Sequence, residues 1–277
     1  MQTWHAPQPP PKARLSVPGW ALAVLRAAVI LALIALGLAL LLTLRLAERP
    51  LCGLRRPVTP FITQAVCRAT LAVMGLRLVI RGQPMTERGA LVANHASWLD
   101  IFALNAAQRV YFVSKADVAN WPGIGWLARA TGTVFIRRDG RDAARQKLLF
   151  EARLRAGHRL LFFPEGTSTD GLRVLPFKST LFAAFFTEGL RDLLHVQPVS
   201  VVYHPPAAAD PRLYGWWGDM DFGPHFLSVL GRLRQGRIEL RFHPPHAVAD
   251  MPDRKALAAR CGADVRAGLE AARPTAS

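Results

Sequence analysis

Residues Leu91–Asp100 have the sequence LVANHASWLD, and the rest of the chain can be interpreted from this segment outward. The apolar run Ala90–Ala93 predicts a buried strand, and an apolar pattern typical of a helix runs over Trp98–Ala107. His95 and Asp100, separated by four residues, therefore stand where a strand passes into a helix. Backbone N–H groups and the positive end of the helix converge at such a junction, which makes it a common place for catalytic residues.

His95 and Asp100 form a candidate acid–base pair. The imidazole would take a proton from an attacking hydroxyl, and the carboxylate would hold its tautomer and stabilise the imidazolium. Positions i and i+5 lie about 140° apart on an ideal helix, so the two side chains meet only if His95 lies on the turn before the helix. The plainer interpretation is a buried histidine at a helix start with an unrelated acid one turn later.

A second block, Phe163–Ser168, has the sequence FPEGTS and follows the apolar run Arg159–Phe163, which predicts another strand. A glycine after a strand often serves backbone geometry alone. The functional interpretation uses the same geometry, since Gly166 lets backbone N–H groups approach an anionic group while Glu165 orders the loop. An ordinary turn between strand and loop is the alternative.

The two blocks carry a resemblance to a known family. Asn94–Asp100 resembles the HxxxxD motif of glycerolipid acyltransferases, and Phe163–Ser168 resembles the FPEGT motif of the same enzymes. The interval of about seventy residues is similar to that of the 1-acylglycerol-3-phosphate (lysophosphatidic acid) acyltransferases. The resemblance covers roughly Leu76–Tyr203 and implies that His95 and Asp100 are the catalytic residues.

The resemblance also implies a set of substrate-binding residues, namely Lys115, Arg138, Glu165, Gly166, Thr167, Ser168 and Lys178. The family usually has arginine after the EGT triplet, where it is thought to hold the phosphate of the acceptor. Here the residue is Ser168, whose hydroxyl carries no charge and cannot replace a guanidinium group. Arg173 and Lys178 are near in sequence and are candidates for the missing charge. For Lys115 and Arg138 the alternative is a solvated charge at the end of a strand.

Composition narrows the range of partners. The chain of 277 residues is 51% hydrophobic and has a formal net charge of +16. Such a charge favours nucleic acid, anionic lipid or a phosphorylated substrate. Because the basic residues are spread along the chain without a nucleic-acid-binding motif, we expect an anionic membrane surface and no nucleic acid. The cysteines at 52, 67 and 261 have no metal-ligand spacing, and their odd number argues against a disulfide framework.

The hydrophobic N-terminal region predicts a membrane anchor. Ala27–Leu44 is a run of 18 residues without a charge, long enough to span a bilayer or nearly so. Its length and the lack of a small-residue cleavage site favour a retained anchor over a signal peptide. Val58–Gly75 is a second apolar segment, so the anchor either crosses the membrane or re-enters it as a hairpin. The arginines after the first segment favour a cytoplasmic catalytic domain at the cell inner membrane.

The order of segments predicts the architecture. Short strands alternating with helices indicate an α/β fold with a mixed, mostly parallel sheet flanked by helices, preceded by an N-terminal membrane-embedded helix or helical hairpin. The expected domains are a disordered basic tail (1–18), anchoring helices (19–75), an acyltransferase catalytic domain (76–250) and a C-terminal amphipathic helix (251–277).

Several elements are predicted in more detail. Arg237–Phe242 is expected as an edge strand and Leu181–Phe186 as a buried helix. Asp142–Ala156 is expected as an amphipathic helix whose outward side chains are Arg145, Lys147 and Arg153.

Trp216–Met220 has the sequence WWGDM. Adjacent tryptophans suit a membrane interface or the mouth of an acyl groove, and a partly buried core is the alternative. Asp219, Asp221 and His225 suggest a metal site, but they lie among core-type residues, so we expect no metal.

The expected activity is transfer of a fatty acyl chain from acyl-CoA or acyl carrier protein to the free hydroxyl of a lysolipid. Because the substrate supplies the hydroxyl, no serine or cysteine nucleophile and no cofactor is needed. The resemblance makes 1-acyl-sn-glycerol-3-phosphate the first acceptor, giving phosphatidic acid, and Ser168 favours lyso-ornithine lipid as the second. The alternative of another class is a non-catalytic basic lipid-binding protein on the membrane.

Overall fold

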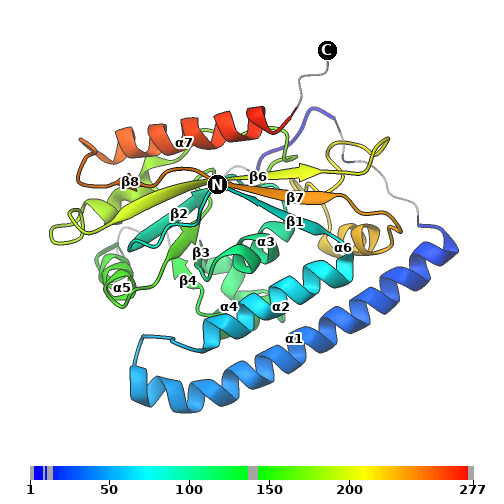
Figure 1. Ribbon diagram of the computed structural model, residues 1–277, viewed down its shortest axis with the longest axis horizontal. Helices are drawn as coiled ribbons and strands as arrows, with labels where there is room; N and C mark the ends of the chain where they lie inside the picture. Colours follow the sequence, from blue (N-terminus) through cyan, green and yellow to red (C-terminus); the bar gives the residue numbers. More distant parts are fainter. Residues whose placement is uncertain (1–2, 9, 11–14, 137–142, 274–277) are drawn as a thin grey trace.

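The structure, a computed structural model, describes residues 3–8, 10, 15–136 and 143–273. Its centre is a sheet with the strand order β1-β7-β6-β2-β5-β3-β4, and β8 pairs with β6 off this path (Figure 1). The strands are β1 (Arg77–Arg81), β2 (Gly89–Ala93), β3 (Tyr111–Lys115), β4 (Val134–Ile136), β5 (Leu160–Phe162), β6 (His195–His204), β7 (Arg237–Phe242) and β8 (His246–Ala247). Only the pairs of β6 with β7 and with β8 are antiparallel among the described strands. The predicted mixed, mostly parallel sheet is confirmed.

Helices cover both faces of this sheet. They are α1 (Val17–Cys52), α2 (Thr59–Met74), α3 (Leu99–Ala107), α4 (Ile124–Thr131), α5 (Ala143–Arg155), α6 (Phe222–Leu230) and α7 (Arg254–Ala271), with the 3₁₀ helices η1 (Ala116–Asn120) and η3 (Ser179–Phe186). Figure 1 shows α7 along one side of the sheet and α3, α2 and α1 on the other, with α1 outermost.

The central strand β2 shows how the sheet is buried on both faces. Leu91 and Ala93 belong to the apolar cluster that also contains buried residues of α2 and α3. Ala90 and Val92 belong to the cluster on the opposite face, with buried residues of η3, α5 and α7. Since successive side chains of a strand point to opposite faces, a continuous apolar run is what a doubly covered parallel strand requires.

The prediction that Arg237–Phe242 is an edge strand is wrong, because β7 lies between β1 and β6. The strand alternates charged and apolar residues, which suggested a solvated face. Glu239 is nevertheless buried, and its carboxylate accepts from Nε of Arg241 at 2.6 Å and lies 3.2 Å from Nε2 of His204. These partners satisfy the charge inside the sheet.

Two helix predictions also need correction. Arg153 on α5 is buried instead of directed outward; its guanidinium donates to the carbonyl of Gly132 and lies over the ring of Tyr111. The side chains of Arg145 and Lys147 lie outside the described residues. The buried segment at Leu181–Phe186 is confirmed, but it forms the 3₁₀ helix η3 rather than an α-helix.

Helices α1 and α2 form an antiparallel pair beside the part of the chain that contains the sheet and both motifs, called the catalytic part below (Figure 1). They approach so closely that a Cβ on Gly37 would lie 2.4 Å from Cγ2 of Val66. Arg26 links α1 to the end of α6, because its guanidinium donates to the carbonyls of Leu230 and Arg232. Among the described residues, α1 is long and apolar enough to cross a membrane: its most hydrophobic 18-residue window has a mean hydropathy of 2.9 and is only 11% buried.

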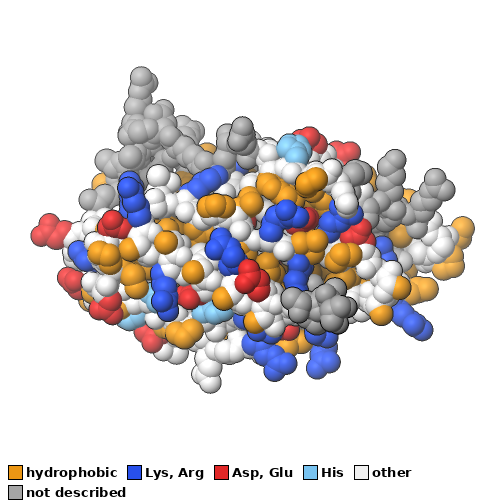
Figure 2. All heavy atoms as spheres, turned by 90° about the horizontal axis from the view of Figure 1, so that it is seen from above, with side chains coloured by type: hydrophobic (Ala, Val, Ile, Leu, Met, Phe, Trp, Pro, Cys, Tyr) orange, Lys and Arg blue, Asp and Glu red, His pale blue; other side chains and the backbone are white. Residues whose placement is uncertain are grey.

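Helix α7 is amphipathic, and its apolar side packs on the sheet. Leu257, Cys261, Val265 and Leu269 are buried, whereas the basic residues are exposed. Figure 2 views the molecule from the side of α7, where Lys and Arg side chains are spread among apolar and neutral ones without forming one block.

Candidate active site

The HxxxxD motif lies on the turn between β2 and α3. Helix α3 begins at Leu99, so His95 is on the turn, and its Nδ1 lies 2.7 Å from Oδ2 of Asp100. The condition for an i, i+5 pair to meet is therefore fulfilled. The side chain of Asp100 is fully buried, while that of His95 keeps 21% of its surface exposed.

Asp100 is held by donors on both carboxylate oxygens. Its Oδ2 also accepts from the N–H groups of Ala96 at 2.8 Å and Ser97 at 3.0 Å, and its Oδ1 accepts from the hydroxyl of Tyr203. Burial, together with the neighbouring Asp100, raises the pKa of Tyr203 well above its ordinary value, so the phenol stays a donor. Because a carboxylate only accepts, Nδ1 of His95 carries the proton and Nε2 is free to accept one.

The FPEGTS block is bonded directly to this turn. The register pairs Val92 with Phe162, so His95 and Glu165 each lie three residues beyond paired positions. The buried carboxylate of Glu165 accepts from the N–H of His95 and the N–H of Leu175, both at 2.7 Å. Burial raises the pKa of Glu165 to about 8 although these hydrogen bonds oppose the shift. Glu165 thus orders the loops around the histidine.

Further contacts fix the orientation of the imidazole. Its ring stacks on Phe163, with ring centroids 4.1 Å apart. The carbonyl of His95 accepts from the N–H of Thr169 at 2.9 Å. Gly166 closes the turn by donating its N–H to the carbonyl of Phe163 at 3.0 Å, with a φ of 74° that favours glycine.

Those of the remaining predicted binding residues that the structure describes lie at the same edge of the sheet, since β2, β3, β4 and β5 are parallel and their carboxyl ends meet there. Lys115 is the last residue of β3 and is exposed. Lys178 is exposed just before η3. Thr167 and Ser168 are half-buried in the loop after β5. Arg138 lies outside the described residues.

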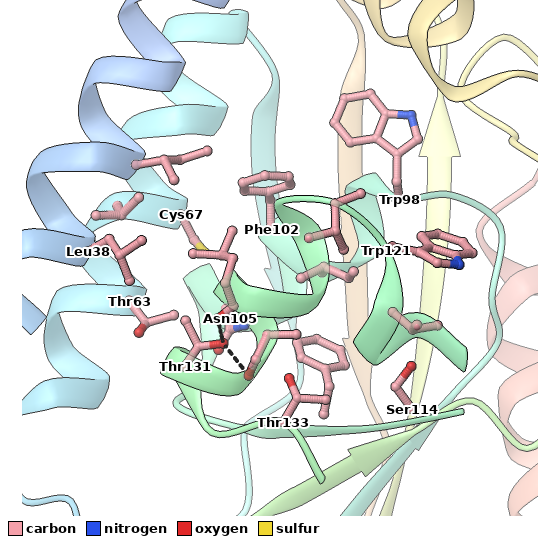
Figure 3. A pocket seen from close by; sticks show the side chains of 18 of the residues that line it. Leu38, Thr63, Cys67, Trp98, Phe102, Asn105, Ser114, Trp121, Thr131 and Thr133 are labelled. Atoms are coloured by element: carbon pink, nitrogen blue, oxygen red, sulfur yellow. Dashed lines mark hydrogen bonds between the residues drawn. The ribbon is translucent and has the colours of Figure 1, made fainter. Parts of the chain in front are cut away.

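A cavity of about 310 Å³ begins at His95 and Phe163 and extends between the α1–α2 pair and the catalytic part. Its walls are mostly apolar: Leu38 comes from α1, Cys67 from α2 and Phe102 from α3, as Figure 3 shows. Polar side chains gather in one part of the lining, where Thr131 bonds to carbonyls of its own helix. The cavity has the shape and chemistry to take an acyl chain whose reactive end lies at the histidine.

The two adjacent tryptophans have different surroundings. Trp216 lines the cavity, as the prediction of an acyl groove requires, whereas Trp217 is buried. His225 is packed behind the site, where its Nδ1 accepts from Nε1 of Trp98 and burial lowers its pKa to about 4. The side chain of Asp219 is 90% exposed. Among the described residues, no three His, Cys, Asp or Glu side chains gather as metal ligands.

Sequence reasoning missed two residues that shape the site. The sequence gives no role to Tyr203, whose hydroxyl donates to Asp100. Asn94 donates through Nδ2 to the carbonyl of Val201 and accepts from its N–H, which ties the end of β2 to β6. A polar residue closing an apolar strand was the signal available in both cases.

Comparisons with known proteins now assign the family. The sequence profile described as Acyltransferase matches residues 77–202, a range that contains both motifs. The lyso-ornithine lipid O-acyltransferase of Rhodobacter capsulatus is 57% identical over 266 residues, which are 96% of this chain and 96% of that relative. The chain belongs to the acyltransferase family.

This acyltransferase is also similar to the 1-acyl-sn-glycerol-3-phosphate acyltransferase of Neisseria meningitidis, with 38% identity over 130 residues, 46% of this chain and 51% of that one. Among solved structures, the 1-acyl-sn-glycerophosphate (LPA) acyltransferase of Thermotoga maritima matches with a TM-score of 0.58 and 20% identity, over 91% of this chain and 99% of that chain. The structural likeness supports the fold, and the predicted family is confirmed.

Proposed function

We propose that this acyltransferase moves a fatty acyl chain from a thioester to the free hydroxyl of a lysolipid, with His95 as general base. The main support for this proposal is that the imidazole of His95 lines the apolar cavity, while its Nδ1 is held by the buried Asp100. The hydroxyl gives its proton to Nε2 of His95 as its oxygen attacks the thioester carbonyl. The tetrahedral intermediate then expels the thiolate, which takes the proton from the imidazolium.

The acceptor that we propose first is lyso-ornithine lipid. The relative from Rhodobacter capsulatus, which is similar over 96% of both chains, acts on that lipid according to its name. Ser168 supports the same choice, since it stands where the family usually has a phosphate-binding arginine. Lysophosphatidic acid is the second candidate, favoured by the similarity to the Neisseria relative.

The acyl donor that we propose is acyl-CoA or acyl carrier protein. Both deliver the chain as a thioester and both are anionic, which suits a protein with a net charge of +16. The same charge supports an anionic membrane surface as the site of action.

We propose that the enzyme works on the cytoplasmic side of the inner membrane, anchored by α1 and α2. The N–H of Trp4 donates to Oγ1 of Thr167, and α2 returns the chain to the same catalytic part. Contacts on both sides of α1 support a hairpin embedded from one side over a single crossing. Alkaline extraction should leave the protein in the membrane pellet, and its release as a soluble protein would refute the anchor.

The acceptor is tested by giving purified full-length enzyme both lysolipids side by side in vesicles of one composition, with labelled acyl-CoA and acyl carrier protein in parallel. We expect a higher kcat/KM with lyso-ornithine lipid. A preference for lysophosphatidic acid would reverse the order of the two acceptors, and turnover of neither would overturn the proposed function.

A further inference from the structure

The segment before α1, residues 3–8, lies on the catalytic part beside the FPEGTS loop. The N–H of Trp4 donates to Oγ1 of Thr167 at 3.3 Å, although 163 positions separate the two residues. A Cβ on Gly218 would lie 3.1 Å from Nδ1 of His5 and 3.6 Å from the carbonyl oxygen of Trp4. The segment therefore touches the FPEGTS loop and the turn after Trp217 at the same time.

The indole of Trp4 contacts a cation and a second aromatic ring. The guanidinium carbon of Arg173 lies 5.1 Å from its ring centroid, and the centroid of the Trp217 ring lies 6.4 Å away. The side chain of Arg173 is 47% exposed, so without a partner it would sample many rotamers. The cation–π contact limits that freedom and leaves the guanidinium accessible.

The same guanidinium is bonded to a buried carboxylate. Nε of Arg173 donates to Oδ1 of Asp170 at 3.3 Å, and Nη2 donates to Oδ2 at 3.1 Å. Asp170 is 2% exposed and also accepts from the N–H of Leu172. Two contacts thus hold Arg173 in place: the ring of Trp4, from the N-terminal segment, and the carboxylate of Asp170, three residues earlier in the same loop.

This pair belongs to the loop that backs the catalytic histidine. Thr169 immediately precedes Asp170, and its N–H donates to the carbonyl of His95. A Cβ on Gly171 would lie 3.1 Å from Cβ of Ala96. Arg173 is therefore the arginine that the fold holds in the loop after Ser168, where the family's phosphate-binding arginine is missing.

We propose that Trp4 is a positioning residue for the acceptor, which acts by holding Arg173 where the lipid headgroup binds. The inference rests on the proposed function. The guanidinium of Arg173 is 47% exposed and suits the carboxylate of a zwitterionic headgroup, whereas Asp170 is 2% exposed and offsets part of the guanidinium's charge. A phosphate monoester carries about −1.5 to −2 charges at pH 7, and the carboxylate of Asp170 repels it. The pair thus favours a zwitterionic lysolipid over lysophosphatidic acid.

The test measures steady-state kinetics of full-length Trp4→Ala, Trp4→Phe and His5→Ala in vesicles with lyso-ornithine lipid. Trp4→Ala should raise the KM for the acceptor about two- to fivefold, the effect of one exposed cation–π contact, with kcat and the KM for the donor unchanged. Trp4→Phe should restore most of the loss, because a phenyl ring also binds a guanidinium. His5→Ala is the matched control and should behave as wild type, since the 3.8 Å contact of its Nδ1 with Asp219 joins two exposed side chains.

A second variant separates recognition from structure. Asp170→Asn keeps an oxygen that accepts from the N–H of Leu172 but removes the negative charge. The KM should fall for lysophosphatidic acid by a larger factor than for lyso-ornithine lipid, because the guanidinium of Arg173 then keeps its full charge. A structural role alone would raise both values.

The outcomes distinguish this inference from the function on which it rests. If wild type acylates lyso-ornithine lipid and Trp4→Ala leaves its KM unchanged, the inference is wrong and the proposed function stands. If Trp4→Ala lowers kcat for both acceptors alike, Trp4 supports the fold and the inference is wrong. If wild type does not acylate lyso-ornithine lipid, the proposed acceptor is wrong and the inference falls with it.

Discussion

The hydroxyl of Tyr203 tests how the carboxylate of Asp100 is held in place. Tyr203→Phe keeps the ring and removes the O–H that donates to Oδ1 of the fully buried Asp100. A hydrogen bond to a charged group contributes about 1.5–3 kcal/mol, so we expect the free energy of unfolding to fall by about that amount. The value of kcat should also fall, because the carboxylate loses one of the contacts that direct Oδ2 at Nδ1 of His95.

Tyr214→Phe is the matched control. Tyr214 is fully buried and packs against Tyr203, with ring centroids 5.6 Å apart. Its hydroxyl donates to Oε1 of Gln235 and accepts from the N–H of Gly236, both neutral groups. Loss of such bonds costs about 0.5–1.5 kcal/mol each, and kcat should stay at the wild-type value because no catalytic group is touched.

The assay combines thermal denaturation with steady-state turnover, both in the same detergent. For a chain of this size, 1 kcal/mol shifts Tm by about 2–4 °C. Tyr203→Phe should lose stability and turnover, whereas Tyr214→Phe should lose stability alone. Unchanged kcat in Tyr203→Phe would show that Asp100 keeps its orientation without the phenol, and the proposed role of the Tyr203 hydroxyl would be wrong.

Three further experiments test the buried carboxyl group of Glu165, the contact between α1 and α2, and the net charge of the chain. Burial raises the pKa of Glu165 from 4.5 to about 8, so its stabilisation of the fold is complete below pH 4.5 and is lost as pH rises through 8. Tm should therefore fall between about pH 4.5 and pH 8, and less so in Glu165→Gln, which is uncharged throughout. Gly37→Leu would place a Cβ 2.4 Å from Cγ2 of Val66, so α1 and α2 would have to move apart; Tm should fall, and an unchanged Tm would mean that the close α1–α2 contact does not stabilise the fold. Activity should rise with the fraction of anionic lipid in vesicles and fall with salt, because the net charge of +16 is screened, and equal activity on neutral vesicles would count against the role of the charge.

The sequence predicted the centre of the site because both motifs are local. His95, Asp100 and Glu165 follow apolar strands within a few residues, and parallel strands bring their carboxyl ends to one edge. The hydrogen bond between Asp100 and Tyr203 spans 103 positions, and the contact between Trp4 and Thr167 spans 163. No periodicity in the sequence marks such contacts.

Apart from the helix type of Leu181–Phe186, the wrong predictions concern buried charges. The pattern of Arg237–Phe242 resembles that of a solvated edge, and Arg153 resembles an exposed residue of an amphipathic helix. Both are buried because partners distant in the sequence satisfy them: His204 lies against Glu239, and the carbonyl of Gly132 accepts from Arg153. Burial of a charge depends on those partners, and the sequence alone does not show which residues they are.

A double-mutant cycle on His95 and Asp100, measured as turnover of lyso-ornithine lipid by membrane-bound enzyme, tests whether the two side chains act as one catalytic unit. His95→Ala should lower kcat by about 10²- to 10⁴-fold, the usual contribution of a general base, with membrane attachment intact. Asp100→Asn should also lower it strongly, because the amide no longer fixes the tautomer. The double variant should be little worse than the more damaging single one, since the two side chains act as a unit. If the losses in kcat at the two positions multiply, His95 and Asp100 act independently and the proposed pairing is wrong.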